Sequence, residues 1–251
     1  MRIALVGYGK MGRMIKQSAL CSSHEIAAII DPFSDDADVT GKSLASLQSC
    51  DFDVVIDFSC PSSAYENILF YAEHGMSAVI GTTGWYSRLD EIKSRIDPNA
   101  CSILYSGNFS IGVAMMMKTV AYISRLMDKV PSYDVCIEEV HHRAKADSPS
   151  GTAEMLKEIV LENIGRKKST VYGNAEGRIG EDELQVASIR LGSVSGIHDV
   201  IFDSDADTIE IKHSARSRKG FADGAVKAAS WIYGRKGFFS FDDFINDFLG
   251  V

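Results

Sequence analysis

The chain has 251 residues, of which 45% are hydrophobic and 24% charged. These proportions are typical of a globular protein with one large or two small domains, and they disfavour disorder, collagen and coiled coil. The formal net charge of −8 argues against nucleic acid or an anionic membrane as the main partner, because binding phosphate groups needs a basic field.

Targeting and membrane signals do not stand out in the sequence. The opening segment, Met1–Val6, is too short an apolar run for a signal peptide, and no apolar stretch reaches the roughly twenty residues that cross a bilayer. The five cysteines are scattered without a C-x-x-C pair, which predicts reduced thiols and no metal site. We therefore expect a cytoplasmic protein that does not bind membranes.

The first hundred residues alternate short apolar runs with amphipathic stretches. The runs are nearly continuous, as expected of strands in a sheet covered on both faces: Ile3–Val6, Ile26–Ile30, Val54–Ile56, Ala78–Ile80 and Ser102–Tyr105. Helical patterns separate them at Met11–Leu20, Ser62–Glu73 and Arg88–Ile96. This series predicts an α/β fold with a Rossmann-like, doubly wound parallel sheet.

The pattern changes near residue 110. In chain order we expect a helix, a strand, a polar loop, a helix, a mobile glycine-rich loop, two or three antiparallel strands and a last helix: Val113–Met127, Tyr133–Val140, His141–Ser150, Thr152–Asn163, Gly165–Asp182, Gln185–His213 and Phe221–Tyr233. We assign residues 1–110 plus 216–251 to a dinucleotide-binding domain. Residues 111–215 are assigned to an α+β domain for substrate binding and oligomerisation, built on a mixed sheet.

A glycine loop, Gly7-Tyr8-Gly9-Lys10-Met11-Gly12, joins the first strand to the first helix. Gly7 permits a tight turn, Gly9 lets the backbone approach a pyrophosphate, and Gly12 allows close helix packing. Asp31 ends the second strand, where a carboxylate would bind the adenosine ribose hydroxyls. The combination predicts a dinucleotide site.

The same carboxylate bears on the choice of cofactor. Asp31 favours NADH, because a 2′-phosphate would meet like charge, and Pro32 offers no cation to offset it. Lys10 and Arg13 are the only nearby cations, and they would still permit NADPH. We expect NADH, or both cofactors.

Two further turns follow predicted strands. Gly81-Thr82-Thr83-Gly84 follows the fourth strand, and Asn108-Phe109-Ser110 follows the fifth. Since we expect the first and fourth strands to flank the ligand crevice, the first turn would face a nicotinamide, and Asn108 and Phe109 would add a carboxamide and an aromatic wall. An ordinary strand-to-helix turn is an equal alternative for the first of them.

The segment Glu139–Ala153 is the strongest constellation. It carries adjacent histidines, His141 and His142, then Lys145, and it ends in small residues at a helix start. Free N–H groups at that start and the lysine charge suit an anionic ligand, with Ser148 or Ser150 as N-cap and Pro149 in the first turn. The histidines offer a proton donor near working pH. A zinc site is the rival interpretation, weakened by the missing third ligand.

Together these motifs resemble the dihydrodipicolinate reductase family, also called 4-hydroxy-tetrahydrodipicolinate reductases, of the diaminopimelate route to lysine. The similarity covers nearly the whole chain and is most specific in E-x-H-H-x-x-K-x-D-x-P-S-G-T-A at Glu139–Ala153. It also includes the glycine loop, Asp57-Phe58-Ser59, Gly81–Gly84, Gly107–Ser110 and R-x-G-x-x-x-G-x-H at Arg190–His198.

The resemblance implies an oxidoreductase in which NADH or NADPH reduces a cyclic dicarboxylate imine to tetrahydrodipicolinate, with hydride added at C4 and a proton at C3. It implies His141 as general acid, a catalytic Lys145, and a homotetramer joined through the second domain. The expected substrate contacts are His142, Lys145, Ser150, Gly151 and Thr152. The expected cofactor contacts are Gly7, Gly9, Lys10, Met11, Gly12, Asp31, Gly81, Thr82, Thr83, Asn108, Phe109, Arg218 and Phe221.

Three departures from the family pattern concern the cofactor. The glycine loop is one residue shorter than in many relatives, Cys60 stands where some carry arginine, and Pro32 replaces a basic residue that some use for the 2′-phosphate. They leave the choice between NADH and NADPH open.

Two other functions compete with this one. Another dehydrogenase with the same first domain, such as meso-diaminopimelate or aspartate dehydrogenase, would lack the histidine, lysine and Ser-Gly-Thr arrangement. A regulator that binds NAD without turnover would not need His141.

Overall fold

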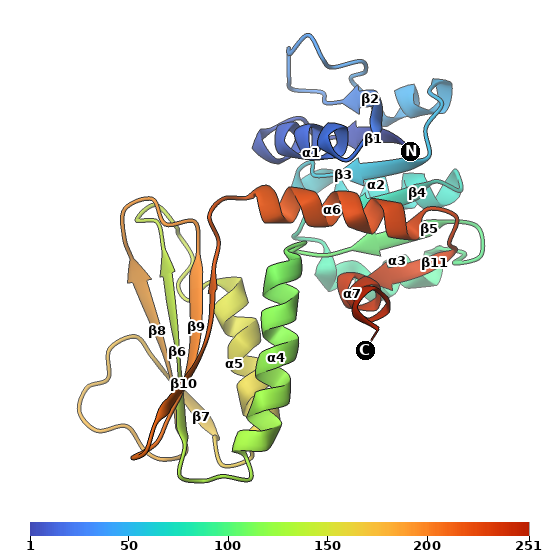
Figure 1. Cartoon of the computed structure of the whole chain (residues 1–251). Coiled ribbons are helices and arrows are strands. Elements are labelled where there is room, and N and C mark those ends of the chain that lie inside the picture. The colour runs from blue at the N-terminus through green and yellow to red at the C-terminus, as the bar shows by residue number, and fades with distance from the viewer. Residues whose placement is uncertain (251) are drawn as a thin grey trace. The chain divides into compact units, whose positions relative to one another are not determined.

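The computed structural model describes residues 1–250, which divide into two compact units. The first unit contains residues 1–111 and the chain from residue 218 onward, and the second contains residues 112–217 (Figure 1). No helix among the described residues is long and apolar enough to cross a membrane.

The first unit is built on a six-stranded parallel sheet. Its order is β11-β5-β4-β3-β1-β2, and the strands are β1 (Arg2–Val6), β2 (Glu25–Ile30), β3 (Val54–Asp57), β4 (Ser77–Ile80), β5 (Ser102–Tyr105) and β11 (Gly237–Ser240). The expected Rossmann-like sheet is confirmed.

Helices cover both faces of this sheet. The helices α1 (Lys10–Cys21) and α6 (Lys219–Ile232) pack on one face, and α2 (Pro61–Glu73) and α3 (Leu89–Arg95) lie on the other (Figure 1). The remaining helices of the unit are α7 (Phe241–Leu249) and two short 3-10 turns, Leu44–Ser49 and Tyr86–Arg88. Both faces of the strands are buried, which explains their nearly continuous apolar sequences.

The sheet order corrects the expected position of the crevice. β1 lies between β2 and β3, so the strand order reverses between β1 and β3. β4 is one strand further away and does not adjoin β1. In an open α/β sheet ligands bind where the order reverses, so the turn after β3 matters more than the sequence suggested.

The second unit holds a five-stranded mixed sheet in the order β10-β9-β6-β8-β7. Its strands are β6 (Asp134–His141), β7 (Ser169–Tyr172), β8 (Glu183–Arg190), β9 (Ile197–Asp203) and β10 (Thr208–Ser214). Two helices, α4 (Ile111–Met127) and α5 (Gly151–Asn163), cover one face of it (Figure 1).

Three expectations for this unit were wrong in detail. β8 runs parallel to β6 and β7, contrary to expectation, whereas β9 pairs antiparallel with β10 as expected and also with β6. β7 forms inside the segment expected to be a loop, because its edge position needs only one pairing partner. β6 continues to His141, which therefore belongs to a strand and not to the loop after it.

The packing of α6 on the first unit generates a prediction. A Cβ atom built at Gly224 would lie 1.7 Å from the carbonyl oxygen of Phe109, whereas one at Gly220 would lie 3.6 Å from its nearest neighbour, Ser110 Oγ. Gly224→Ala should lower the free energy of unfolding by roughly 1–3 kcal/mol through the forced backbone shift. Gly220→Ala, in the same helix, should raise it by up to about 1 kcal/mol. Urea denaturation of both variants measures the difference, and equal effects would contradict the packing.

Candidate active site

The face of β6 that packs under the helices changes character along the strand. Val135 and Ile137 are buried in the apolar core below α4 and α5. Two and four residues further along, Glu139 and His141 point to the same face, because side chains alternate along a strand. Glu139 is fully buried and His141 is 8% exposed. The end of the core therefore holds an ionisable pair.

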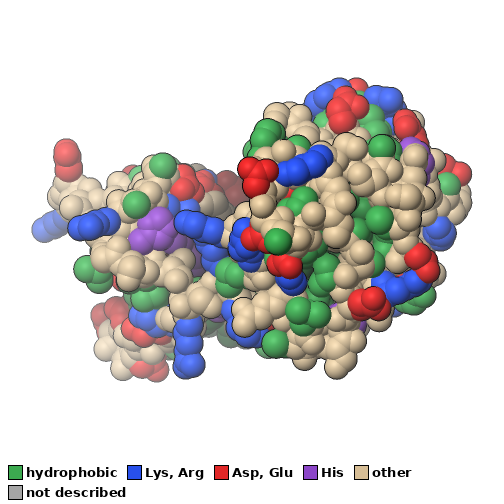
Figure 2. All heavy atoms as spheres, turned by 90° about the horizontal axis from the view of Figure 1, so that it is seen from above, with side chains coloured by type: hydrophobic (Ala, Val, Ile, Leu, Met, Phe, Trp, Pro, Cys, Tyr) green, Lys and Arg blue, Asp and Glu red, His purple; other side chains and the backbone are tan. Residues whose placement is uncertain are grey.

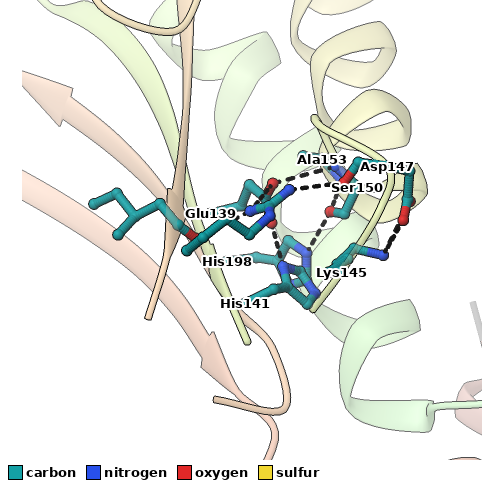
Figure 3. Close-up of polar contacts among 9 residues, drawn as sticks. Glu139, His141, Lys145, Asp147, Ser150, Ala153 and His198 are labelled. Atoms are coloured by element: carbon teal, nitrogen blue, oxygen red, sulfur yellow. Dashed lines mark hydrogen bonds and ion pairs between the residues drawn. The ribbon is translucent and has the colours of Figure 1, made fainter. Parts of the chain in front are cut away.

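Glu139 is the centre of the polar contacts (Figure 3). One carboxylate oxygen, Oε2, makes a short contact with Nδ1 of His141. The other, Oε1, lies 2.9 Å from Arg190 Nη1 and accepts a 3.3 Å hydrogen bond from the backbone N–H of Ser150. Burial tends to raise the pKa of Glu139, but hydrogen bonds, including those from Arg190 and His141, hold it below its usual value. The carboxylate is therefore ionised at neutral pH.

His141 has a lowered pKa in this arrangement. Burial is the largest cause, and it outweighs the pairing with Glu139, which raises the pKa. The positive charges of Lys145 and Arg190 lower it further. In the free protein His141 is therefore mainly neutral at pH 7, and a negatively charged ligand would favour its protonation.

His198 completes the cluster from β9. Its Nε2 lies 3.1 Å from Ser150 Oγ, and its ring packs edge-on against His141 with centroids 5.1 Å apart (Figure 3). Its Nδ1 is buried without a hydrogen-bond partner in the part of the chain described. Burial lowers the pKa of His198 to about 4. Donor atoms of Glu139, His141 and His198 lie within 4.8 Å of one another, close enough to hold a metal ion.

The start of α5 lies beside this cluster. Ser150 is the N-cap and its Oγ accepts a 3.2 Å hydrogen bond from the N–H of Ala153. Pro149 precedes the cap and is not in the first turn, contrary to expectation. A Cβ atom built at Gly151 would meet no atom within 4 Å, so the first turn opens onto free space. The positive end of the helix dipole is thus accessible to an anion.

The loop between β6 and α5 carries the predicted lysine. Lys145 Nζ forms an ion pair with Asp147, at 2.8 and 2.9 Å from the two carboxylate oxygens (Figure 3). His142 is half-buried in the same loop. Histidine side chains reach the surface of this unit near lysine and arginine side chains (Figure 2). The structure therefore brings His141, His142, Lys145, Ser150, Gly151 and Thr152 onto one strand end, one loop and one helix start.

The first unit has a pocket of about 570 Å³ at the carboxyl ends of β1, β2 and β3. It is lined by Gly7, Gly9 and Asp31, among the predicted cofactor contacts. Space around Gly9 is open, since a Cβ atom there would meet nothing within 4 Å. Gly12 packs against the loop itself, because its Cβ atom would lie 2.2 Å from the carbonyl oxygen of Gly7. A nucleotide fits this combination of open backbone and acidic strand end.

Asp31 is held by the backbone around it. Its carboxylate accepts hydrogen bonds from the N–H groups of Tyr8, Phe33 and Ser34, at 2.6, 2.8 and 2.9 Å. Partial burial tends to raise the pKa of Asp31, but these three hydrogen bonds lower it below its usual value. Negative charge therefore persists at the part of the pocket that Asp31 lines.

A cation that the sequence did not reveal also lines this pocket. Lys42 reaches it because Gly41 bridges to Ile30 at the end of β2. Its Nζ lies 3.3 Å from Asp35. Lys10 is exposed at the start of α1, and Arg13 is paired with Asp36 at 2.5 Å. The expectation that Lys10 and Arg13 are the only nearby cations was therefore wrong.

Three of the predicted cofactor residues, Gly7, Gly81 and Phe109, lie against Phe58, in the turn after β3. Cβ atoms at Gly7 and Gly81 would lie 2.3 Å from its carbonyl oxygen and 2.1 Å from its ring. Phe109 is 1% exposed, and its ring lies 5.8 Å from that of Phe58. The space that Gly81 provides is thus filled by Phe58, and Phe109 is a core residue. Met11, Thr83, Asn108, Arg218 and Phe221 lie at the start of α1, in the turns after β4 and β5, and at the start of α6.

A buried carboxylate, Asp57, fixes this turn. Its oxygens accept five hydrogen bonds at 2.6–3.1 Å from uncharged donors: the N–H and Oγ of Ser59, Asn67 Nδ2, Tyr71 OH and Thr82 Oγ1. The network joins the end of β3 to α2 and to the turn after β4. The Thr82 hydroxyl is therefore engaged inside the protein.

Models of dihydrodipicolinate reductase match both parts of the chain, the N-terminal one over residues 1–109 and the C-terminal one over residues 112–245. The chain belongs to the dihydrodipicolinate reductase family. The expectation of an oxidoreductase of this family is confirmed.

Relatives in this family match over nearly their full length. A 4-hydroxy-tetrahydrodipicolinate reductase from Christiangramia forsetii is 37% identical over 250 residues, covering 98% of each chain. One from Acinetobacter baumannii is 35% identical over 257 residues, covering 94% of this chain and 92% of its own. A dipicolinate-bound dihydrodipicolinate reductase from Paenisporosarcina sp. TG-14 shares the fold with a TM-score of 0.78 at 22% identity, covering 96% and 97% of the two chains.

Some residues of this dihydrodipicolinate reductase family member were given no role from sequence. Glu139 was noted only as the first residue of the signature, although its spacing of two from His141 on a strand places both on one face. Arg190 and His198 were noted only as the ends of a family motif, and the structure places both in contact with the cluster. No sequence signal marks Lys42, whose position depends on the path of a loop.

Burial of neutral His198 makes stability depend on pH. The pKa of about 4 in the folded protein is below the usual value of 6.5, so the unfolded chain binds the proton first and stability falls as pH drops from 6.5 towards 4. At pH 5 the loss attributable to His198 should be about 2 kcal/mol. The difference in unfolding free energy between pH 8 and pH 5 should therefore shrink by that amount in His198→Gln. His74→Gln, which removes an exposed histidine of the other unit, is the control.

Proposed function

We propose that this chain reduces 4-hydroxy-tetrahydrodipicolinate, or the dihydrodipicolinate derived from it, to tetrahydrodipicolinate in the diaminopimelate pathway of lysine biosynthesis. The observation that carries the proposal is the histidine that lies beside an open helix start on β6 and α5. A proton donor next to an anion site suits reduction of an unsaturated dicarboxylate. Family membership supports the reaction class.

The nicotinamide cofactor of the family, NADH or NADPH, supplies the hydride when bound. In this proposal the glycine loop holds the pyrophosphate of the cofactor at the start of α1, through Gly7, Gly9, Lys10, Met11 and Gly12. Asp31 binds the adenosine ribose. The remaining contacts come from the turns after β4 and β5 and from the start of α6. The residues are Gly81, Thr82, Thr83, Asn108, Phe109, Arg218 and Phe221.

The start of α5 and its loop bind the substrate carboxylates. Lys145 exchanges its exposed partner Asp147 for a carboxylate of the substrate, which keeps the ammonium paired. The backbone of Gly151, with Ser150, Thr152 and His142, receives the carboxylate charge at the positive end of the helix dipole. This arrangement orients the ring without a metal ion.

His141 then acts as the general acid. The two negative charges of the substrate raise the pKa that burial keeps low, so the imidazolium forms when the substrate is present. It delivers its proton to C3 of the substrate ring, while the hydride is added at C4. Lys145 assists by binding a carboxylate of the substrate, whose negative charge favours the protonated form of His141.

We also propose that NADH is preferred and NADPH accepted. The ionised Asp31 disfavours a 2′-phosphate by like charge, and Lys42 in the pocket wall offsets part of that repulsion.

Two further expectations stay proposals. A cytoplasmic location agrees with the five cysteines, all of which are free in the structure. A homotetramer joined through the second unit agrees with the sheet face opposite the helices, which carries the exposed Ile189.

Three substitutions test the assigned roles. His141→Ala should lower kcat by about 10²–10⁴-fold, the usual effect of losing a general acid. His142→Ala should mainly raise KM for the substrate, and Lys145→Ala should change both. Oxidation of reduced nicotinamide is followed with substrate made in place by condensing pyruvate with aspartate semialdehyde through the upstream synthase. Full activity of His141→Ala would remove the proton-donor role, and folded wild-type protein that binds nucleotide without turnover would favour a regulator.

The cofactor proposal makes a separate prediction. Wild-type kcat/KM should be higher with NADH than with NADPH. Lys42→Met should reduce kcat/KM for NADPH several-fold and leave the value for NADH nearly unchanged, because only the 2′-phosphate needs a cation there. Lys93→Met removes an exposed lysine of α3 and is the control. A parallel fall with both cofactors would exclude a role for Lys42 in discrimination.

A further inference from the structure

We propose that Glu139 is a positioning residue that holds the ring of His141 with its proton on Nδ1 and its Nε2 turned outward to serve the substrate, and that Arg190 anchors Glu139 in this role. The inference rests on the proposed function insofar as His141 is the proton donor. It goes further because it assigns the donating atom and the groups that select it.

The contact between Glu139 and His141 determines which ring nitrogen of the histidine carries a proton. An ionised carboxylate can only accept hydrogen bonds, and Glu139 is ionised and fully buried. Its Oε2 faces Nδ1 of His141 (Figure 3). Nδ1 must therefore carry a proton whether the ring is neutral or charged. Proton transfer to a substrate is left to Nε2.

The residue next to Nε2 of His141 is a glycine, Gly196. A Cβ atom built at Gly196 would lie 3.0 Å from Nε2 of His141, closer than to any other atom of the ring. The backbone at Gly196 has φ +149°, a conformation that residues with side chains rarely adopt. The residue beside Nε2 is thus one that adds no side chain over the donating atom.

Arg190 and Ser150 anchor the carboxylate of Glu139. Its Oε1 is held by Arg190 at 2.9 Å and by the N–H of Ser150, which leaves Oε2 for the histidine. Arg190 also donates to the carbonyl oxygens of Asp147 and Ile189, at 2.7 and 3.0 Å. The guanidinium therefore joins β8, the carboxylate and the loop that carries Lys145. One carboxylate fixes the proton donor relative to the start of α5.

A metal ion held by Glu139, His141 and His198 is the competing use of the same atoms. Arg190 already places a positive charge 2.9 Å from that carboxylate, and Ser150 engages His198 Nε2. These contacts favour an imidazole–carboxylate pair. Metal analysis of the purified protein belongs to the test, and a stoichiometric tightly bound ion would overturn the proposal.

The decisive measurement does not depend on activity. Protein labelled with ¹⁵N-histidine, without substrate, should show His141 with its proton on Nδ1 in long-range ¹H–¹⁵N spectra at neutral pH, the signal being assigned by its loss in His141→Gln. Observation of the Nε2–H form would overturn the proposal even if the protein is an active reductase. If the wild-type protein has no reductase activity, the proposed function fails, and this spectrum still decides the role of Glu139.

The kinetic test is Glu139→Gln beside Glu138→Gln. In Glu139→Gln the side-chain carbonyl pairs with Arg190, so the amide donates to Nδ1 and favours the opposite tautomer. We expect kcat to fall by about 10²-fold or more, with a smaller change in KM and unchanged cofactor affinity. Glu138 lies on the opposite face of β6, and its variant should keep wild-type values.

The pH profile separates positioning from simple loss of structure. The charged and titratable groups that face His141 are Glu139, Arg190, His198 and Lys145. Removing the one negative charge among them lowers the pKa of the acid, so the fall of kcat with rising pH should begin at lower pH in Glu139→Gln. Glu139→Asp, which keeps the charge, should recover part of kcat. Wild-type kcat and an unshifted profile in Glu139→Gln would overturn the proposal.

Discussion

The alternation of side chains along β6 is the constraint on which the second unit depends. One face of this strand carries Val135 and Ile137 into the core and then Glu139 and His141 into the site, without a change of backbone conformation. The packing of Val135 and Ile137 in the core holds the strand rigidly. This fixes the positions of Glu139 and His141 at its end. A shift of the strand by one residue would exchange both halves with the opposite face.

In the first unit a buried carboxyl group, that of Asp57, fixes the residues at the end of β3. Asp57 collects five hydrogen bonds from uncharged groups at the end of β3, where the strand order of the sheet reverses. These donors come from α2 and from two turns, so the ligand edge of the sheet is fixed by one side chain. In both units a carboxyl group that lacks solvent is stabilised by several fixed donors, as a buried polar group requires.

Much of this was predictable from sequence, and the reasons for the failures are physical. The βαβ series, the glycine loop between the first strand and the first helix, and the histidine signature depend on local periodicity and spacing, which the chain displays directly. The parallel pairing of β8 with β6, the reach of Lys42 into the pocket and the pairing of Arg190 with Glu139 depend on contacts between distant segments. β7 and β11 are short strands that tertiary packing rather than local pattern stabilises. α7 does carry local signals, a capping box formed by Ser240 and Asp243 and a left-handed Gly250 at its C-cap, and the expectations from sequence did not use them.

The return of the chain to the first unit has a consequence for how the molecule forms. Residues 112–217 are contiguous, so the second unit has all of its strands and helices before the chain from residue 218 onward is synthesised. The first unit must wait for α6 to cover one face of its sheet and for β11 to pair with the open edge of β5. During synthesis the first unit is therefore the last to close, with the edge of β5 unpaired until the segment from residue 218 onward, 34 residues in length, emerges.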